Sequence, residues 1–246
     1  VIPVEAASSK EEYSAYTLRR KIGEKIPEYL GEIEKVELKN KKPVKISLKD
    51  KLLDLDNPFM GMKIDKSVKV VKGLTGGETP ALKIFKSFLK SRFRGYHIRR
   101  NDPNLKANSG MSPYLHFGQI SPIRMALEVK GQVDLNDEKM AFLEELIVRR
   151  ELAVNFVFYN ENYDSFKGLP DWAKKTLMVH KNDRRKYIYL LEELERSKTH
   201  DPYWNRAQEK LVRNGTMHGY MRMYWGKKIL EWTEDPREGL RRAIYL

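Results

Sequence analysis

Three tryptophans near the end of the 246-residue chain have a spacing that suits one-electron chemistry. Trp225 and Trp232 are seven residues apart, which is two turns of one helix face and about 10.5 Å along the axis. Trp204 lies on the helix expected just before them. The three rings could form an electron relay, in which each indole is oxidised in turn and then reduced by an electron from the next indole. Core packing explains the same stripe and, from spacing alone, is its more common cause.

A second candidate is the turn that opens residues 108–127, where small hydroxyl and amide side chains lead into a helix. Asn108, Ser109 and Ser112 would offer hydroxyl, amide and backbone N–H groups to a phosphate. A well-capped helix start accounts for the same residues and is favoured by local chemistry alone. The Gly-rich stretch 73–80 is weaker as a phosphate loop because no Gly-Lys-Ser/Thr follows it.

A third candidate is the charged pair Glu145 and Arg149, which stand one turn apart in an apolar helix. This spacing predicts a partly buried ion pair with a structural role. Alternatively, an apolar site would raise the pKa of the Glu145 carboxyl, which could then donate a hydrogen bond or a proton to a ligand. The five histidines show no metal-binding spacing, so no metal site is expected.

The charge balance points to a polyanionic partner. The chain has 47 Lys and Arg against 34 Asp and Glu, a net charge of +13. Nucleic acid is the first expectation and an anionic membrane surface the second. Residues 88–100 and 181–190 interleave basic and aromatic side chains, as binders of single strands or flipped bases do, although a solvated helix face is the commoner cause of one such run.

Several classes of protein are disfavoured by composition. With no cysteine, the chain has no disulfide framework or thiolate metal site, which fits a reducing compartment. No run reaches about 18 apolar residues, so no membrane span is expected. The first residues lack the pattern of an export signal, and the missing initiator methionine suggests a fragment.

The elements that must position these residues are mainly helical. Residues 1–8 begin as a short β-like run, residues 10–35 form an amphipathic helix, and residues 35–80 read as a charged connector interrupted by Pro and Gly. Thr79 is the expected N-cap of the next helix, with Pro80 at its first position. The apolar stripe of that helix comprises Leu82, Phe85, Phe88, Leu89 and Phe93.

The second half of the chain predicts a layered helical bundle. Asn136 or Asp137 caps a long central helix that runs to residue 160. Gly215 ends one later helix and Pro236 helps to end another. These later helices are expected at 183–197, 202–213, 216–232 and 236–245.

Four long segments resemble DNA photolyases of the class II cyclobutane pyrimidine dimer type. They are "YHIRRNDPN" (96–104), "MSPYLHFGQIS" (111–121), "FLEELIVRREL" (142–152) and "DPYWNRAQEKLVRNGTMHGYMRMYWGKKILEWT" (201–233). Weaker similarity extends to residue 1. Val148 and Gly219 differ from the class I pattern and agree with class II. The resemblance covers essentially the whole chain but only part of the family's length.

The resemblance implies a mainly α fold, the helical FAD-binding domain of photolyase type, preceded by the last piece of an α/β antenna domain and a linker. The implied boundaries are 1–45 for the end of the antenna domain and the start of the linker, 46–78 for the linker, and 79–246 for a C-terminally incomplete helical catalytic domain that binds FAD and DNA. An antenna chromophore would belong to the missing N-terminal domain.

The same resemblance implies light-driven repair of cyclobutane pyrimidine dimers in DNA by electron transfer from excited, reduced FAD to a flipped-out dimer. Glu145 and Met223 would contact the dimer. Trp225 would lie nearest the flavin, Trp204 between, and Trp232 toward the surface. The implied FAD-binding residues are Tyr96, Asn108, Ser109, Met111, Ser112, Arg149 and Arg222.

Other implied properties are a monomer that acts on dimer-containing DNA, without a membrane, in the cytoplasm of a prokaryote or the nucleus of a eukaryote. Two alternatives stay open. One is a non-catalytic flavin photoreceptor or DNA-binding fragment of the same family. The other is a basic helical nucleic-acid binder with no cofactor, against which the phosphate-binding turn and the tryptophan spacing argue.

Overall fold

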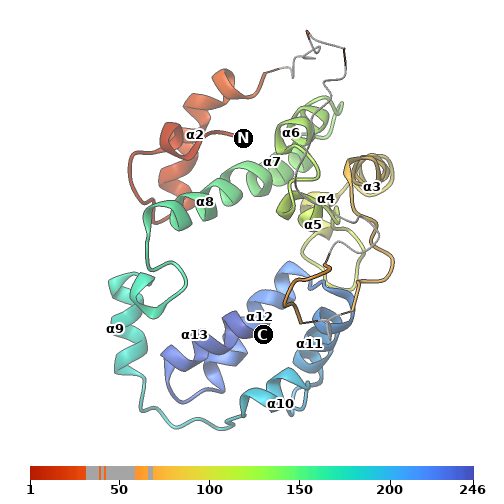
Figure 1. The fold of residues 1–246 in the computed structure, drawn as a ribbon. Coiled ribbons are helices and arrows are strands. Elements are labelled where there is room, and N and C mark those ends of the chain that lie inside the picture. The colour runs from red at the N-terminus through yellow and green to blue at the C-terminus, as the bar shows by residue number, and fades with distance from the viewer. Residues whose placement is uncertain (32–38, 40–41, 43–58, 66–68) are drawn as a thin grey trace.

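The computed structural model describes residues 1–31, 39, 42, 59–65 and 69–246, and every regular element in these ranges is a helix. Figure 1 shows two groups of helices joined by the chain between α8 and α9. The first group comprises α1 (Val4–Ala7), α2 (Ala15–Tyr29), α3 (Glu78–Ser91), α4 (Tyr96–Arg99), α5 (Ser112–His116), α6 (Pro122–Lys130), α7 (Asn136–Leu143), the π-helical turn η1 (Glu144–Arg149) and α8 (Arg150–Tyr159).

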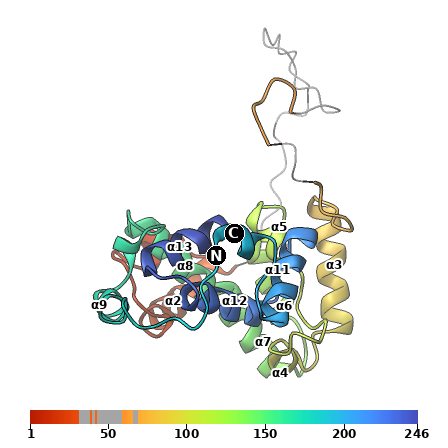
Figure 2. The same cartoon turned by 90° about the horizontal axis from the view of Figure 1, so that it is seen from below.

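The second group follows the short 3₁₀ turn η2 (Phe166–Gly168). It comprises α9 (Asp171–Val179), α10 (Leu191–Glu195), α11 (Pro202–Asn214), α12 (Gly219–Glu231) and α13 (Pro236–Tyr245). Figures 1 and 2 both place α3 and α9 at opposite ends of the molecule. The predicted mainly helical fold is therefore confirmed.

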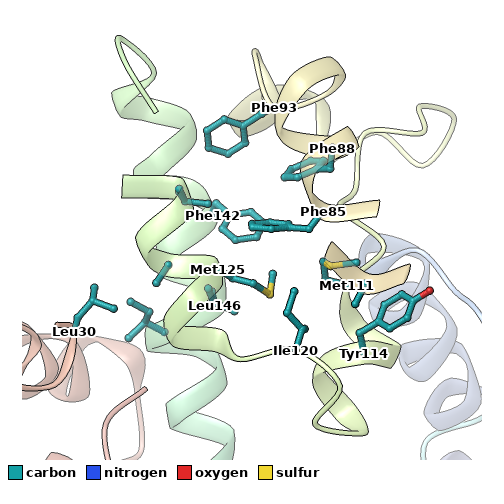
Figure 3. Close-up of a cluster of buried hydrophobic side chains, with 14 of the residues drawn as sticks. Leu30, Phe85, Phe88, Phe93, Met111, Tyr114, Ile120, Met125, Phe142 and Leu146 are labelled. Carbon is teal, nitrogen blue, oxygen red and sulfur yellow. The ribbon is translucent and has the colours of Figure 1, made fainter. Parts of the chain in front are cut away.

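The first group encloses an aromatic core. The rings of Phe85, Phe88, Phe93 and Phe142 pack with centroid separations of 5.7 to 6.3 Å and are fully or almost fully buried. Figure 3 shows these side chains, from α3, α7 and the turn after α3, pointing toward one another. The predicted stripe is confirmed, because Leu82 and Leu89 also pack against this core.

Residues 1–30 pack onto the same core. Ile2, Leu18, Ile22 and Leu30 are buried in it, and α1 and α2 contact α8 and η1. The short β-like run expected at residues 1–8 is wrong, since Val4–Ala7 form a helical turn in which the Ala7 N–H donates to the Pro3 carbonyl. The boundary proposed at residue 45 lies outside the described residues, as do residues 46–58 and 66–68 of the proposed linker.

The start positions of α2, α3 and α7 differ from those predicted from the sequence. The helix expected at 10–35 is described from Ala15 to Tyr29, with the Ser14 side chain as its cap. Helix α3 starts one residue before Thr79, because Gly77, at φ +112°, is its N-cap. Helix α7 starts at Asn136, with Leu135 at the N-cap position and no side-chain cap, so neither Asn136 nor Asp137 caps it.

In the second group, α11, α12 and α13 match the helices expected at 202–213, 216–232 and 236–245 to within three residues. Gly215 adopts the left-handed conformation expected at the end of α11. The helix expected at 183–197 is wrong except for Leu191–Glu195. Residues before it follow the surface of the second core instead, with the Tyr189 N–H donating to the Trp232 carbonyl.

Candidate functional site

The three tryptophans form the centre of the second core. Trp204 comes from α11, Trp225 from α12 and Trp232 from the residue that ends α12. The Trp204 ring stacks on Trp225 with a centroid separation of 6.4 Å and an interplanar angle of 4°. It meets Trp232 edge-on at 5.6 Å. Trp204 therefore lies between the other two, which is the order that the resemblance implies.

The indole N–H groups of the stacked pair have neutral acceptors. Trp225 Nε1 donates to the Gln208 side-chain oxygen at 2.7 Å, and Trp204 Nε1 donates to the Trp225 carbonyl at 3.1 Å. Gln208 is buried on the same face of α11 as Trp204, four residues on. Sequence reasoning missed Gln208, although its i+4 position relative to Trp204 was a usable signal.

The start of α11 is fixed by Asp201. Its carboxylate accepts hydrogen bonds from the N–H groups of Tyr203 and Trp204, which caps the helix, and another from the Tyr224 hydroxyl on α12. Burial and the Asp201 carboxylate raise the pKa of Tyr224 to about 12. Because one carboxylate holds both helices, it also fixes how Trp204 and Trp225 face each other.

The outer end of the tryptophan series differs from the expected arrangement. The resemblance implies that Trp232 lies toward the surface, yet Trp232 is only 1% exposed. Tyr189, His200 and the Lys228 side chain lie against its ring. Its Nε1 is buried and has no hydrogen-bond partner among the described residues. The aromatic series thus continues past Trp232 to Tyr189 and His200.

A second cluster forms around Tyr96 in the first group. Tyr96 packs against Phe88, Phe93 and Phe142, and burial raises the pKa of its hydroxyl. Arg100 lies over the Tyr96 ring at 5.8 Å and forms an ion pair with Glu145 at 2.9 Å. Arg100 therefore links Tyr96 to Glu145, and sequence reasoning missed it although it stands four residues after Tyr96.

The predicted Glu145–Arg149 ion pair is wrong. Arg149 contacts Glu144 instead, at 3.3 Å, and Glu144 also binds Arg19 at 2.7 Å. The reason is the π-helical turn Glu144–Arg149, which brings residues five apart onto one face rather than four apart. The Glu145 side chain is 45% exposed, so it does not lie in an apolar site.

The turn at residues 108–112 presents polar groups that are not already engaged. Gly110 has φ +77°, and the Asn108 side chain and Ser112 hydroxyl form no hydrogen bond with any described residue. The Arg92 guanidinium donates to the Asn108 carbonyl at 2.8 Å and so holds the turn. The Ser109 hydroxyl accepts from the Met111 N–H at 3.4 Å.

Met111 differs from its neighbours in the turn. Its side chain is buried in the first core and points into the cluster of Figure 3. The Met111 carbonyl accepts from the Leu115 N–H at 3.0 Å, so only the Met111 N–H, by giving up its 3.4 Å hydrogen bond to Ser109, could contact a ligand at this turn.

The two groups of helices meet at the start of α12. His218, which caps α12, lies close enough to the Arg100 backbone and Asp102 for both to act on its pKa, which burial nevertheless lowers. Arg222 and Met223 follow on the exposed side of this helix, and Met223 is 56% exposed. The Tyr96–Arg100 cluster and the tryptophan-bearing helix thus adjoin.

Two hollows lie away from these residues. One, of about 330 Å³, lies beside Pro80 and Tyr114, and the other, of about 240 Å³, lies between α9 and α12. Neither contains a predicted site residue. Among the described residues there is no group of three His, Cys, Asp or Glu side chains placed to bind a metal, and none of the described helices has the length and apolarity needed to span a bilayer.

Comparison with known proteins gives matches that cover the whole of this chain. The chain is 44% identical over 247 residues to the deoxyribodipyrimidine photo-lyase of Potorous tridactylus, covering 100% of this chain and 46% of the relative. It is 45% identical over 254 residues to the enzyme of that name from Methanothermobacter thermautotrophicus (100% and 53%) and 46% identical over 258 residues to the one from Arabidopsis thaliana (100% and 51%). The chain is therefore similar over its whole length to proteins named deoxyribodipyrimidine photo-lyase.

Two solved structures share the fold of this chain. A Synechocystis cryptochrome matches with a TM-score of 0.60 and 18% identity, covering 99% of this chain and 52% of that one. A class III photolyase from Agrobacterium tumefaciens matches with a TM-score of 0.52 and 23% identity (69% and 37%). No protein-family profile matches. The chain spans about half the length of its curated photolyase relatives.

Proposed function

We propose that this chain is the FAD- and DNA-binding part of a class II photolyase, which repairs cyclobutane pyrimidine dimers in DNA by light-driven electron transfer. The main support is the contact series Trp225–Trp204–Trp232, in which ring centroids are 6.4 and 5.6 Å apart in the order expected for a relay. Identity of 44–46% to proteins named deoxyribodipyrimidine photo-lyase supports the same activity.

The residues present fit FAD. Asn108, Ser109 and Ser112 would hold its phosphates and ribityl chain, because the Asn108 amide and the Ser112 hydroxyl are exposed and form no hydrogen bond with any described residue. The Met111 N–H would join them by exchanging its 3.4 Å hydrogen bond to Ser109. Tyr96 would border the same ligand. Reduced FAD, when bound, supplies the light-driven one-electron reductant.

Charged residues complete this proposed site. Arg222 extends from α12, and within the described part of the chain it donates only to the Met217 carbonyl, at 3.4 Å, which leaves most of its guanidinium donors for a ligand. Arg149 is half-exposed and lies beside Glu144. Both cations would favour an anionic cofactor and the DNA backbone.

Glu145 and Met223 would contact the flipped-out dimer. Both are accessible, and Arg100 fixes the Glu145 carboxyl through an ion pair of 2.9 Å. A carboxyl group held in place beforehand would form a hydrogen bond to the base without reorganising when charge develops there. The flexible, polarisable side chain of Met223 would adapt to the apolar faces of the bases.

The tryptophans would restore the reduced state. Trp225 would donate an electron to the cofactor, Trp204 would then reduce the oxidised Trp225, and Trp232 would reduce the oxidised Trp204. The acceptors of the Trp225 and Trp204 N–H groups, an amide and a carbonyl, are not bases. An oxidised indole in this pair would therefore keep its proton, and the charge would move by electron transfer alone.

The test is repair of a synthetic oligonucleotide containing one thymine dimer, under near-UV light and with a reductant. Light-dependent loss of the dimer is expected, and Glu145→Gln should lower repair while the protein still binds FAD. Normal FAD binding with no repair would instead support the non-catalytic photoreceptor or DNA-binding module. A protein that binds no flavin but binds DNA with steep salt dependence would support the cofactor-free alternative.

A further inference from the structure

The structure contains an unassigned pair at the outer end of the tryptophan series, Tyr189 and His200. The Tyr189 ring lies 5.3 Å from that of Trp232, edge-on, and the His200 ring is also 5.3 Å from Trp232. The Tyr189 hydroxyl oxygen is 2.6 Å from Nδ1 of His200. A phenol that can be oxidised and a base that can take its proton thus both touch the last tryptophan.

The direction of the hydrogen bond follows from the neighbouring donor. The backbone N–H of His200 donates to the Tyr189 hydroxyl oxygen at 2.9 Å. Since that oxygen already accepts one hydrogen bond, the arrangement that gives each proton a partner has the phenol O–H donating to Nδ1. The neutral His200 then carries its proton on Nε2.

The backbone holds Tyr189 in this place from two sides. Its N–H donates to the Trp232 carbonyl at 3.3 Å, and its carbonyl accepts from the Arg242 guanidinium at 2.6 Å. Tyr187 stacks on His200 at 3.7 Å and supports the imidazole. The pair is therefore positioned by α12, α13 and the segment before α10 together.

Trp232 is a poor final site for positive charge. Its buried N–H donates to no protein group of the described residues, whereas the Tyr189 hydroxyl contacts a base directly. The Lys228 ammonium lies 5.7 Å over its ring and further disfavours a cation there. His200 is the first base in direct contact with the series, and it is exposed, so water can solvate the imidazolium.

We propose that Tyr189 is the terminal electron donor of the series and that His200 accepts its proton. One electron passes from the Tyr189 phenol to oxidised Trp232, while the O–H bond breaks and its proton forms a bond to Nδ1 of His200. The products are neutral Trp232, a neutral tyrosyl radical and an imidazolium. This inference rests on the proposed function, whose light-excited flavin supplies the oxidant.

The experiment uses azide radicals, produced by pulse radiolysis, which oxidise tryptophan directly without flavin or light. Because Trp172 is 74% exposed and lies outside the cluster, the otherwise unaltered protein and every variant are compared in a Trp172→Phe background, so that the tryptophan radical forms in the series. In the unaltered protein, the absorption of the tryptophan radical should decay into that of a tyrosyl radical within one molecule, and more slowly in D₂O. Tyr189→Phe should abolish this conversion above the background from other tyrosines. Its persistence at the original amplitude in Tyr189→Phe would overturn the proposal.

His200→Gln tests the proton acceptor. The Gln side-chain oxygen can still accept a hydrogen bond from Tyr189 but cannot take its proton, so the conversion should be about tenfold slower or more. Tyr187→Phe is the matched control, because it keeps the ring on His200, and it should leave the rate unchanged. An equal rate in His200→Gln and the unaltered protein would rule out the role of His200.

A measurement on the unaltered protein guards against misfolded variants. Electron–nuclear double resonance of the tyrosyl radical should show one strongly coupled exchangeable proton, held by the protonated His200, and its absence would contradict the proposal. Failure of the repair function is distinguishable, since Trp225→Phe would impair flavin photoreduction yet leave the azide-driven step from Trp232 to Tyr189 intact.

Discussion

The indole planes of Trp204 and Trp225 are 4° apart, with centroids separated by 6.4 Å, and the N–H of Trp204 donates to the carbonyl of Trp225. One ring is therefore held both by stacking and by a hydrogen bond to the residue that carries the other. This double constraint makes the pair a rigid unit between α11 and α12. It is the geometry on which the proposed relay to the flavin depends.

Replacing Trp225 by Phe should slow flavin photoreduction strongly. Phe keeps a flat apolar ring but is much harder to oxidise than an indole, so the series loses its first donor. The rate is measured from the bleaching of oxidised flavin under blue light with an external reductant. Trp172→Phe is the matched control: this tryptophan is 74% exposed on α9 and outside the cluster, and its variant should reduce at the normal rate. Equal rates for the two variants would refute the relay.

Gln208→Leu should destabilise the second core by about 1–3 kcal/mol, because the buried N–H of Trp225 loses its acceptor. Urea unfolding followed by tryptophan fluorescence measures the loss. Glu209→Gln, on the neighbouring exposed position, should stay within about 0.5 kcal/mol of the unaltered protein. A Gln208→Leu variant as stable as this control would mean that the hydrogen bond contributes nothing to folding.

The sequence predicts the tryptophan series better than its surroundings. Spacing along one helix places Trp225 and Trp232 two turns apart, and Gly215 marks the turn that brings Trp204 back alongside. The parallel stacking could not be predicted, because it depends on side chains that join two helices, namely Asp201 and Tyr224. Periodicity reports which face is buried but not how two faces rotate against each other.

Three other differences between the sequence-based prediction and the structure have identifiable physical causes. The expected Glu145–Arg149 pair assumed α-helical geometry, whereas the π-helical turn changes which residues share a face. The helix expected over 183–197 was displaced by tertiary contacts, since Tyr189 bonds to Trp232 and Arg242. Arg100 was missed because its role appears only when Tyr96 and Glu145 come together from distant parts of the chain.

Asp201→Ala should cost about 1 kcal/mol, because α11 loses its N-cap. Asp201→Asn keeps a capping oxygen and should retain most of that stability, as urea unfolding would show. Both changes remove the carboxylate beside Tyr224, whose pKa of about 12 should fall, though not to the ordinary value of 10, because burial still raises it. NMR titration of the Tyr224 ring measures this. A pKa that stays at about 12 in Asp201→Asn would show that burial alone sets it.

The ionisation of the Glu12 carboxyl should make the free energy of unfolding depend on pH. Glu12 is 4% exposed and holds residues 8–12 against α8: its N–H donates to the Asn155 side chain at 2.7 Å, and its carboxylate binds Lys21 and Ser8. Burial alone would raise the pKa of Glu12, but the hydrogen bonds from Lys21, Thr17 and Ser8 outweigh burial and lower it from 4.5 to about 2.

Because the folded pKa of Glu12 lies below the unfolded one, its contribution is complete above pH 4.5 and is lost as the pH falls toward about 2. The contribution lost is at most about 3 kcal/mol. Glu12→Gln should therefore be less stable than the unaltered protein at neutral pH, and the difference in the free energy of unfolding should shrink across this acid range. Glu11→Gln, at an exposed neighbour, should keep the full acid dependence. A constant difference between Glu12→Gln and the unaltered protein from neutral pH to about pH 2 would show that the Glu12 carboxyl titrates alike in both states.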